Sequence, residues 1–515
     1  MGTYILRRLL LMVPTVIGMT LLVFLLVAAS PGGIGAALNV SGGGQMESGT
    51  SKAQQQAYLE DRYGLDAPVV VQYLRWLGRV SPVKFGQRDL VAPTGEVIRS
   101  PRPIEPPMHW ESFVDALPSV STPPEPFVFP SDVTDEDRSR AYRRASQGYT
   151  RVRAEYVLAR AGYEQAIGEG LRAVGLDRHA NRDGTMKGGT PASAVRAVLD
   201  DPEQGELARA AFGEAIEWYE EVIEERRALK AVFDARPFPP AGFPLIPGVV
   251  SVATPDLGMS FARGRPVSTL IGDALPKTLL LNFMAIPIIY FIAVPSGMLA
   301  ATRRGGLFDV LSGGLYVALW SIPIVWACVL MLGFLANKET GLGWFPVTGL
   351  NSIEGERMTW LPDRASDGTF VRGFVLDTLW HMCLPVAALV YAGFAVLSKQ
   401  TRAAMLDNFN ADYVRTAKAK GVRSRDVVLR HVFRNSLLPI ITMFVSIFPA
   451  MLGGSVVVER VFSVPGMGNL VIDAIFLRDR EVLLANALII GLVNMLALLL
   501  ADVLYALADP RVSYD

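Results

Sequence analysis

Hydrophobic residues are gathered into long blocks along this chain instead of being spread evenly. A helix that crosses a bilayer needs roughly 20 mostly apolar residues, because each residue advances the helix by about 1.5 Å. Six blocks meet this requirement, at residues 9–29, 278–300, 314–336, 380–397, 437–458 and 483–507. The pattern predicts an all-α polytopic membrane protein with six transmembrane helices and a long polar stretch after the first.

The first block has two interpretations. Arg7 and Arg8 precede it, and Val27-Ala28-Ala29 resembles the cleavage site of a signal peptide. Its apolar run of about 21 residues is longer than the roughly 7 to 15 residues typical of a signal peptide. We therefore expect residues 1–30 to be retained as the first transmembrane helix.

Lysine and arginine predict the orientation, because the cytoplasmic loops of membrane proteins are enriched in them. Cations precede the first block and follow the second, and nine lie between residues 399 and 434 against three aspartates. The loop 337–379 instead holds four cations and six acids. The pattern indicates that both termini lie in the cytoplasm and that the polar stretch lies outside.

The polar stretch changes composition along its length. A short amphipathic helical pattern at 71–77 lies in the segment 31–81, and proline-rich runs follow at 81–131 and 237–255. Proline fixes φ and lacks a donor, so these runs predict extended spacers without regular helix.

Two helical patterns lie between the spacers. In the first, tyrosines recur every seven residues with an apolar residue three positions after each: Tyr142, Tyr149, Tyr156 and Tyr163, with Ala145, Val152, Ala159 and Ala166. The second has the same spacing, broken at Glu225: Ala208, Ala211, Ala215, Trp218, Val222, Leu229 and Val232. Heptad spacing favours an antiparallel hairpin in which large residues of one helix face small residues of the other. Binding of carbohydrate or peptide by the tyrosines stays an alternative.

Composition excludes several classes of protein. Hydrophobic residues make up 51% and charged residues 19%, which excludes a disordered chain. Two cysteines exclude a disulfide framework. The zero net charge divides into −5 for residues 31–276 and +5 for the rest. No catalytic motif, phosphate-binding loop or His-based metal motif occurs, so we expect no catalytic residue, no metal site and no cofactor in this chain.

Two acidic features remain. Residues 179–184 contain a fragment of an EF-hand loop, but His179 and Thr190 occupy its first and twelfth positions, so a plain turn is favoured and calcium binding is an alternative. Asp502 lies within the last apolar block. Pairing with a neighbouring helix or with the interface is favoured for it over a proton relay.

The basic loop 399–436 carries the sharpest motif. Met405, Phe409, Tyr413 and Ala417 recur every four residues, which predicts one helix with an apolar stripe, ending at Gly421. A second helix is predicted at 423–435. Such a helix beneath the membrane is suited to docking in a groove of a cytoplasmic partner, and adsorption to anionic lipid is the alternative.

This loop resembles the EAA loop of ABC-importer permeases, in the form found in the oligopeptide/dipeptide branch. The matching residues are 413–421, followed by Leu429-Arg430-His431 and Arg434-Asn435. Further matches lie at 1–31, 63–77, 256–261, 264–267, 275–279, 458–468 and 507–511. Glu-Ala-Ala of the general pattern is Arg415-Thr416-Ala417 here, and about 170 residues at 82–255 separate elements that are nearly adjacent in that branch.

The resemblance implies the type I permease fold, with a first transmembrane helix at 1–30, an extracytoplasmic helical segment at 31–81 and a permease core at 256–515. Residues 82–255 are then an inserted extracytoplasmic module, with the helical hairpin at 133–235. It also implies a multi-pass subunit of the cytoplasmic (inner) membrane of a bacterium. The partners are a second homologous permease, two cytoplasmic ATPases that hold ATP and Mg, and an extracytoplasmic substrate-binding protein.

On this resemblance the chain moves di- or oligopeptides or a related small solute, and the solute itself is not specified. The ATPase-coupling residues are Phe409, Asp412, Tyr413, Arg415, Thr416, Ala417, Lys418, Lys420 and Gly421. The translocation path includes Pro323, Pro385, Pro449, Gly453 and Gly454. A membrane-anchored receptor whose hairpin is the active part is the rival class. A further hypothesis is that the hairpin docks the substrate-binding protein or caps the entrance.

Overall fold

The structure is a computed structural model of the chain. It describes residues 2–29, 64, 68–86, 88–93, 97–117, 127–130, 133–181, 183–260, 262–364, 370–437, 439–444 and 456–508. Two compact units make up the chain. The first contains residues 1–30 and 257–515, and the second contains residues 31–256, which are the polar stretch of the sequence.

The second unit begins with an amphipathic helix and a small sheet. Helix α4 (Val69–Val80) buries Tyr73 and Trp76. Strand β1 (Val83–Phe85) pairs antiparallel with β5 (Val250–Val252), which also pairs with β4 (Phe243–Ile246), giving the order β1-β5-β4. The pairing places Val83 opposite Val252. The chain therefore leaves this sheet after one outer strand, β1, returns at the other outer strand, β4, and ends in the central strand β5.

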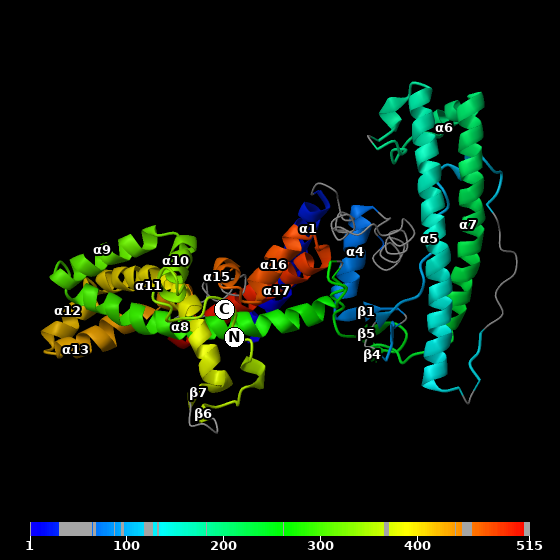
Figure 1. The fold of residues 1–515 in the computed structure, drawn as a ribbon. Helices are drawn as coiled ribbons and strands as arrows, with labels where there is room; N and C mark the ends of the chain where they lie inside the picture. The colour runs from blue at the N-terminus through cyan, green and yellow to red at the C-terminus, as the bar shows by residue number, and fades with distance from the viewer. Residues whose placement is uncertain are drawn as a thin grey trace. The chain divides into compact units, whose positions relative to one another are not determined.

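Two long helices form the hairpin of the second unit. Helices α5 (Asp135–Ala173) and α7 (Pro202–Asp234) lie side by side, and the short α6 (Ala192–Asp200) packs on both near one end (Figure 1). Thr134 caps α5 and Asp201 caps α7, each accepting backbone N–H bonds of the first turn. The hairpin predicted from the heptads is thus present in the structure.

Three of the four heptad tyrosines of α5 are core residues of this hairpin, and Tyr142 is half-buried. Tyr149, Tyr156 and Tyr163 are each at most 3% exposed, so the structure gives them no binding surface. Small residues such as Ala208 and Ala215 are buried on α7 as predicted. The prediction that only small residues face the tyrosines was wrong, because Tyr219 lies 5.7 Å from Tyr156 and Phe212 lies 5.7 Å from Tyr163, centroid to centroid. The buried stripe of α5 also shifts from Ala166 to Ile167, as expected when a 3.6-residue turn drifts against a seven-residue repeat.

The first proline-rich run is partly a third layer of the hairpin, which corrects the predicted spacer. The hydroxyl groups of Tyr156 and Tyr163 donate to the carbonyl oxygens of Glu105 (2.6 Å) and Met108 (2.7 Å). The 3₁₀ turn η1 (Trp110–Ser112) leads to Phe113, whose ring stacks on Phe212 at 4.3 Å. A segment without regular helix has free backbone carbonyls, and the buried tyrosine hydroxyls need such acceptors.

The remaining elements of this unit are short. Strands β2 (Leu90–Val91) and β3 (Val97–Ile98) form a two-stranded ribbon against the hairpin base, where Leu90 and Ile98 meet Phe233. After η2 (Asp177–His179), the loop continues with Asp183, whose carboxylate accepts from the backbone and hydroxyl of Thr185. These bonds hold the pKa of Asp183 below its usual value. The loop therefore has the internal hydrogen bonds of a turn.

The first unit is built from long apolar helices. They are α1 (Gly2–Ala29), α8 (Val267–Thr302), α9 (Leu307–Ser321), α10 (Ile324–Met331) continued by the π-turn η3 (Leu332–Ala336), α11 (Gly373–Phe409) and α17 (Arg480–Ala508). Between η3 and α11 lie η4 (Gly355–Arg357) and the ribbon of β6 (Asp363–Arg364) with β7 (Phe370–Val371). Before α17 lie α15 (Val456–Val461) and α16 (Met467–Phe476).

Among the described residues, four of these helices are long and apolar enough to span a membrane, and the number is five if the bent pair α9–α10 is counted as one span. A different segment, the span predicted from the sequence at 437–458, lies largely outside the described residues. Phe283 and Phe291 on α8 are 77% and 82% exposed. Large apolar faces of this kind suit contact with lipid or another apolar helix.

The core of this unit is the packing of α8 on α11. The face of α8 repeats every four residues, with Leu281, Ala285, Ile289 and Ala293 each at most 3% exposed. They meet Met382, Ala388 and Leu397 of α11 in one cluster. Small residues at this spacing allow two helices to approach closely, which is the usual arrangement for helices packed in a membrane.

The span predicted at 314–336 is broken in the structure. Helix α9 ends at Ser321, α10 begins at Ile324, and the two axes are bent by 91°. Pro323 lacks a backbone donor and disfavours helical geometry at the residue before it, and Ile322 is extended at φ −82° and ψ 117°. Pro385, by contrast, is buried within the continuous α11.

Two polar contacts fix the C-terminal part of this unit. Arg8 of α1 pairs with Asp502 of α17 at 3.1 Å, so the predicted pairing of Asp502 with a neighbouring helix is confirmed. Glu459 is fully buried and accepts from the hydroxyl of Thr278 (2.8 Å) and the amide of Asn469 (3.1 Å). A Cβ at Gly466 would lie 2.6 Å from this carboxylate, which explains the glycine that follows Pro465.

We expect Phe212→Ala to loosen the hairpin, because the ring is 4% exposed and contacts Phe113 and Tyr163. Loss of a buried phenylalanine ring costs about 3 to 5 kcal/mol. Hydrogen exchange of the full chain should show faster opening of amides in α5 and α7. Leu207→Ala on the same helix is the matched control, since Leu207 is 57% exposed and should change opening by less than about 0.5 kcal/mol. Equal exchange in the two variants would contradict the packing.

Candidate functional site

The basic loop folds as a short helix attached to the end of α11. Helix α11 stops at Phe409, the chain turns at Asn410 and Ala411, and α12 (Asp412–Ala419) follows. The single helix predicted through Met405 and Ala417 was therefore wrong. Ala411 is extended at φ −71° and ψ 146°, and its amide donates to the carbonyl of Asn408 at 3.1 Å. This turn redirects the chain and separates the two halves of the predicted stripe.

The end of α12 lies where the sequence predicted it. Gly421 has φ +72°. Its amide donates to the carbonyl of Lys418 (3.0 Å), and the amide of Val422 donates to that of Ala417 (3.2 Å). These two bonds form a Schellman motif, in which the residue with positive φ is usually glycine.

Val414 and Ala417 anchor α12 to the rest of the unit. They are 0% and 6% exposed and share a cluster with Ala301 of α8 and Met405 of α11. The cluster also takes in Val427 and Val432 of the following segment, which comprises α13 (Ser424–Asp426) and the π-helix η5 (Val427–Phe433). The predicted helix at 423–435 is thus helical but partly π-wound.

Polar contacts complete the attachment, and sequence reasoning missed them. The side-chain amide of Asn408 donates to the hydroxyl of Ser436 (3.1 Å). That hydroxyl in turn donates to the backbone carbonyl of Ala404 (3.1 Å). Tyr413 donates through its hydroxyl to the side-chain oxygen of Asn408. Ser436 is fully buried. No periodicity marks Asn408 or Ser436 in the sequence, since they are single polar residues 28 positions apart.

Most predicted coupling residues lie on the outer face of α12 and its end. Asp412, Tyr413, Arg415, Thr416, Lys418, Lys420 and Gly421 are exposed, Phe409 is half-buried and Ala417 is buried. The Arg415–Asp412 pair is solvent-exposed at 3.6 Å and contributes little to stability. The exposed face therefore combines one aromatic ring with cations, and apart from the Tyr413–Asn408 bond its contacts stay within α12, which leaves its surface available for docking.

Within the part of the chain that the structure describes, the predicted translocation residues do not form one site. Pro323 occupies the N-cap position of α10, and Pro385 lies within α11. Pro449, Gly453 and Gly454 lie outside the described residues.

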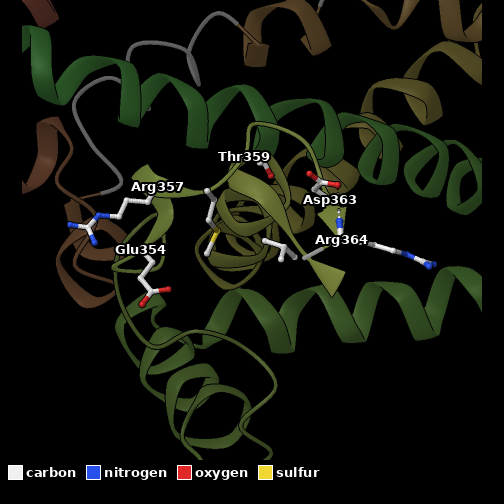
Figure 2. Close-up of a pocket in the computed structure, with 7 residues that line it drawn as sticks. Glu354, Arg357, Thr359, Asp363 and Arg364 are labelled. Carbon is white, nitrogen blue, oxygen red and sulfur yellow. Dashed lines mark hydrogen bonds between the residues drawn. The ribbon is translucent and has the colours of Figure 1, made fainter. Parts of the chain in front are cut away.

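A hollow of about 510 Å³ lies in the loop between η3 and α11. Figure 2 shows Glu354 and Arg357 on one side of it and Asp363 and Arg364 on the other. The charges of the two acids and the two arginines sum to zero, and all four side chains are exposed. This hollow gives no preference for a ligand of either charge.

Comparison with known proteins identifies the family. Residues 293–514 match the family described as binding-protein-dependent transport system inner membrane component. The chain is 37% identical over 261 residues to the oligopeptide transport system permease protein AppB of Bacillus subtilis (strain 168), covering 50% of this chain and 76% of that protein. It is 34% identical over 273 residues to the di/tripeptide transport system permease protein DppB of Pseudomonas aeruginosa (strain UCBPP-PA14), covering 52% and 79%.

A third relative is the inner membrane ABC transporter permease protein YejB of Escherichia coli O157:H7, 34% identical over 261 residues, which cover 50% of this chain and 68% of that protein. Among solved structures, the inward-facing MetNI methionine ABC transporter overlaps 47% of this chain and 97% of its own, with 14% identity and a TM-score of 0.35. The matched relatives and the family domain agree with each other. The chain belongs to the binding-protein-dependent transport system inner membrane component family, the permease subunits of ABC importers.

Proposed function

We propose that this chain is the permease subunit that carries peptides through an ATP-driven importer in the cytoplasmic membrane of a bacterium. The observation that carries the proposal is the 37% identity to an oligopeptide permease over most of that protein's length. The DppB and YejB relatives support the same role. The described spans supply the membrane path, and bond-making chemistry is left to partner subunits.

The proposed complex contains a second homologous permease, two cytoplasmic ATPases that bind ATP and Mg, and an external substrate-binding protein. The exposed face of α12 is the proposed ATPase contact, since it presents Tyr413, Arg415 and Lys418 away from the buried Val414 and Ala417. Closure of the ATPases moves α12, and the spans then switch from an inward-facing to an outward-facing arrangement. The binding protein releases its peptide into the opened cavity.

Both termini lie in the cytoplasm in this proposal, and residues 31–256 lie outside. We expect Lys418→Cys to react with a membrane-impermeant maleimide only after lysis, and Arg151→Cys on α5 to react in intact cells; both positions are exposed. The background needs Cys328→Ser and Cys383→Ser, because Cys383 is exposed. Labelling of both sites from the same side would contradict the topology.

The ATPase contact is tested by reversing charge on α12. We expect Arg415→Glu with Lys418→Glu to weaken co-purification of the ATPases at least about tenfold, or about 1.4 kcal/mol, and peptide uptake should fall with it. These side chains are exposed, so the fold is unaffected. Ala417→Asp is less informative, because Ala417 is 6% exposed and the change buries a charge.

Arg303→Glu is the matched control for that experiment. Arg303 is exposed at the end of α8, on the same side of the membrane in the proposed topology, and lies outside α12. If the α12 variant retains full ATPase binding and peptide-stimulated ATP turnover, the coupling assignment fails and the receptor alternative gains support.

The module at 82–255 is proposed to be separable and to dock the substrate-binding protein. Its ends meet where β1 pairs with β5, so Phe85 can be joined to Val250 by an Asn-Gly turn in place of residues 86–249. We expect the shortened chain to bind the ATPases within about twofold of the parent. Uptake should fall because the binding protein is held less tightly. Normal uptake with normal binding-protein affinity would overturn the docking role.

A further inference from the structure

One ion pair in the first unit joins two helices beside α12. The guanidinium of Arg402 on α11 contacts the carboxylate of Asp309 on α9 in bidentate geometry, with Nε–Oδ1 at 2.6 Å and Nη2–Oδ2 at 2.8 Å. The amide of Gly305 also donates to Oδ2 at 2.9 Å. The side chain of Asp309 is 7% exposed and that of Arg402 is 35% exposed. Two parallel bonds fix orientation as well as distance.

The same turns of α11 are held against α8 by close backbone contact. A Cβ at Gly297 would lie 2.5 Å from the carbonyl oxygen of Ser398 and 2.8 Å from Cβ of Thr401. The hydroxyls of Ser296 and Ser398 are 2.8 Å apart. Only glycine permits this approach, so α11 is fixed to α8 one turn before Arg402 reaches α9.

The end of α11 is in turn fixed to α12. Met405 is buried together with Val414 and Ala417, and the hydroxyl of Tyr413 on α12 donates to the side-chain oxygen of Asn408 on α11. Arg402 therefore lies on a stretch of α11 that is held on one side by α8 and on the other by the α12 cluster. The Asp309–Arg402 pair is the ion pair that connects this stretch to α9 among the described residues.

We propose that Asp309 and Arg402 are positioning residues that make α9 move as one body with α11 and α12. Displacement of α12 is then passed to α9 and through the Pro323 break to α10. The break matters because α10 lies at 91° to α9, so a shift along α9 becomes a sideways shift of α10. The inference rests on the proposed function, since it assumes that α12 receives the ATPase stroke.

The pair suits this role better than apolar packing alone. Methyl groups in contact can slide by a fraction of a helix turn, whereas a bidentate pair with a third donor has one geometry. Removing Arg402 leaves the largely buried carboxylate of Asp309 without its counterion, and removing Asp309 leaves the half-buried guanidinium of Arg402 without its bidentate acceptor; both disfavour the connected arrangement. A pair whose two charges are exchanged keeps the attraction between α9 and α11, but it loses the bond from Gly305 and places a cation in the first turn of α9 near Arg304.

The experiment uses the complete importer in proteoliposomes and measures peptide transported per ATP hydrolysed. We expect Asp309→Asn and Arg402→Gln each to lower this ratio at least about tenfold, with ATPase binding and basal ATP turnover within about twofold of the parent. The double exchange Asp309→Arg with Arg402→Asp should give a ratio at least about threefold above that of either single variant, because it restores the attraction although not the bond from Gly305. Arg303→Gln removes a cation from the same region and should leave the ratio unchanged.

A second measurement reads the motion directly. Spin labels at Val310→Cys on α9 and Ala419→Cys on α12, both exposed, report the distance between the helices in a background without Cys328 and Cys383. The proposal expects one distance with and without ATP in the parent, and a second or broadened distance in Asp309→Asn. This readout remains available if transport is lost completely.

The outcomes separate the two proposals. An unchanged transport ratio and an unchanged distance in Asp309→Asn would overturn the positioning role while leaving the permease assignment intact. Full ATPase binding by the Arg415→Glu, Lys418→Glu chain would instead remove the basis of the α12 contact. A general folding defect would lower ATPase binding and both rates together, and the charge exchange would not restore it.

Discussion

Close packing of α8 against α11 is the constraint on which the first unit depends. In an apolar solvent the hydrophobic effect does not hold helices together, so contact area and close approach must do so. The four-residue repeat from Leu281 to Ala293 supplies the area, and Gly297 supplies the approach. Val458 and Phe462 pack into the same cluster, and Ala301 at the end of α8 joins the cluster that holds α12. One helix pair thus contributes to both clusters.

Much of this architecture was predictable because it follows from composition. The length of the apolar blocks predicted spans such as 278–300 and 483–507. The heptad spacing of residues that include Tyr156 predicted the hairpin. The stop of α12 at Gly421 follows from local backbone chemistry, which requires no distant partner. The branch resemblance also identified the family, because its motifs lie in several separate parts of the chain.

What the sequence did not predict depends on contacts between distant residues. The four-residue spacing placed Tyr413 on one apolar stripe with Met405 and Ala417. The turn at Asn410–Ala411 interrupts that stripe, so Val414 is buried beside Ala417 while Tyr413 is exposed. The bend at Pro323 was indistinguishable from an ordinary membrane proline, since Pro385 sits in an unbroken helix. The proline-rich run was predicted to be a spacer because the hydroxyl groups that donate to its carbonyl oxygens belong to Tyr156 and Tyr163, some fifty residues later in the chain.

The pairing of β1 with β5 has a consequence for how such a chain tolerates change. The ends of the long excursion between these strands are held together by backbone bonds, whatever lies between them. Closing a loop costs free energy that grows only with the logarithm of its length, so doubling it adds about 0.6 kcal/mol. Lengthening or shortening the excursion is therefore nearly neutral for the helices it interrupts. Whole domains can therefore be inserted, lost or exchanged between β1 and β5 during evolution without altering the membrane-spanning helices.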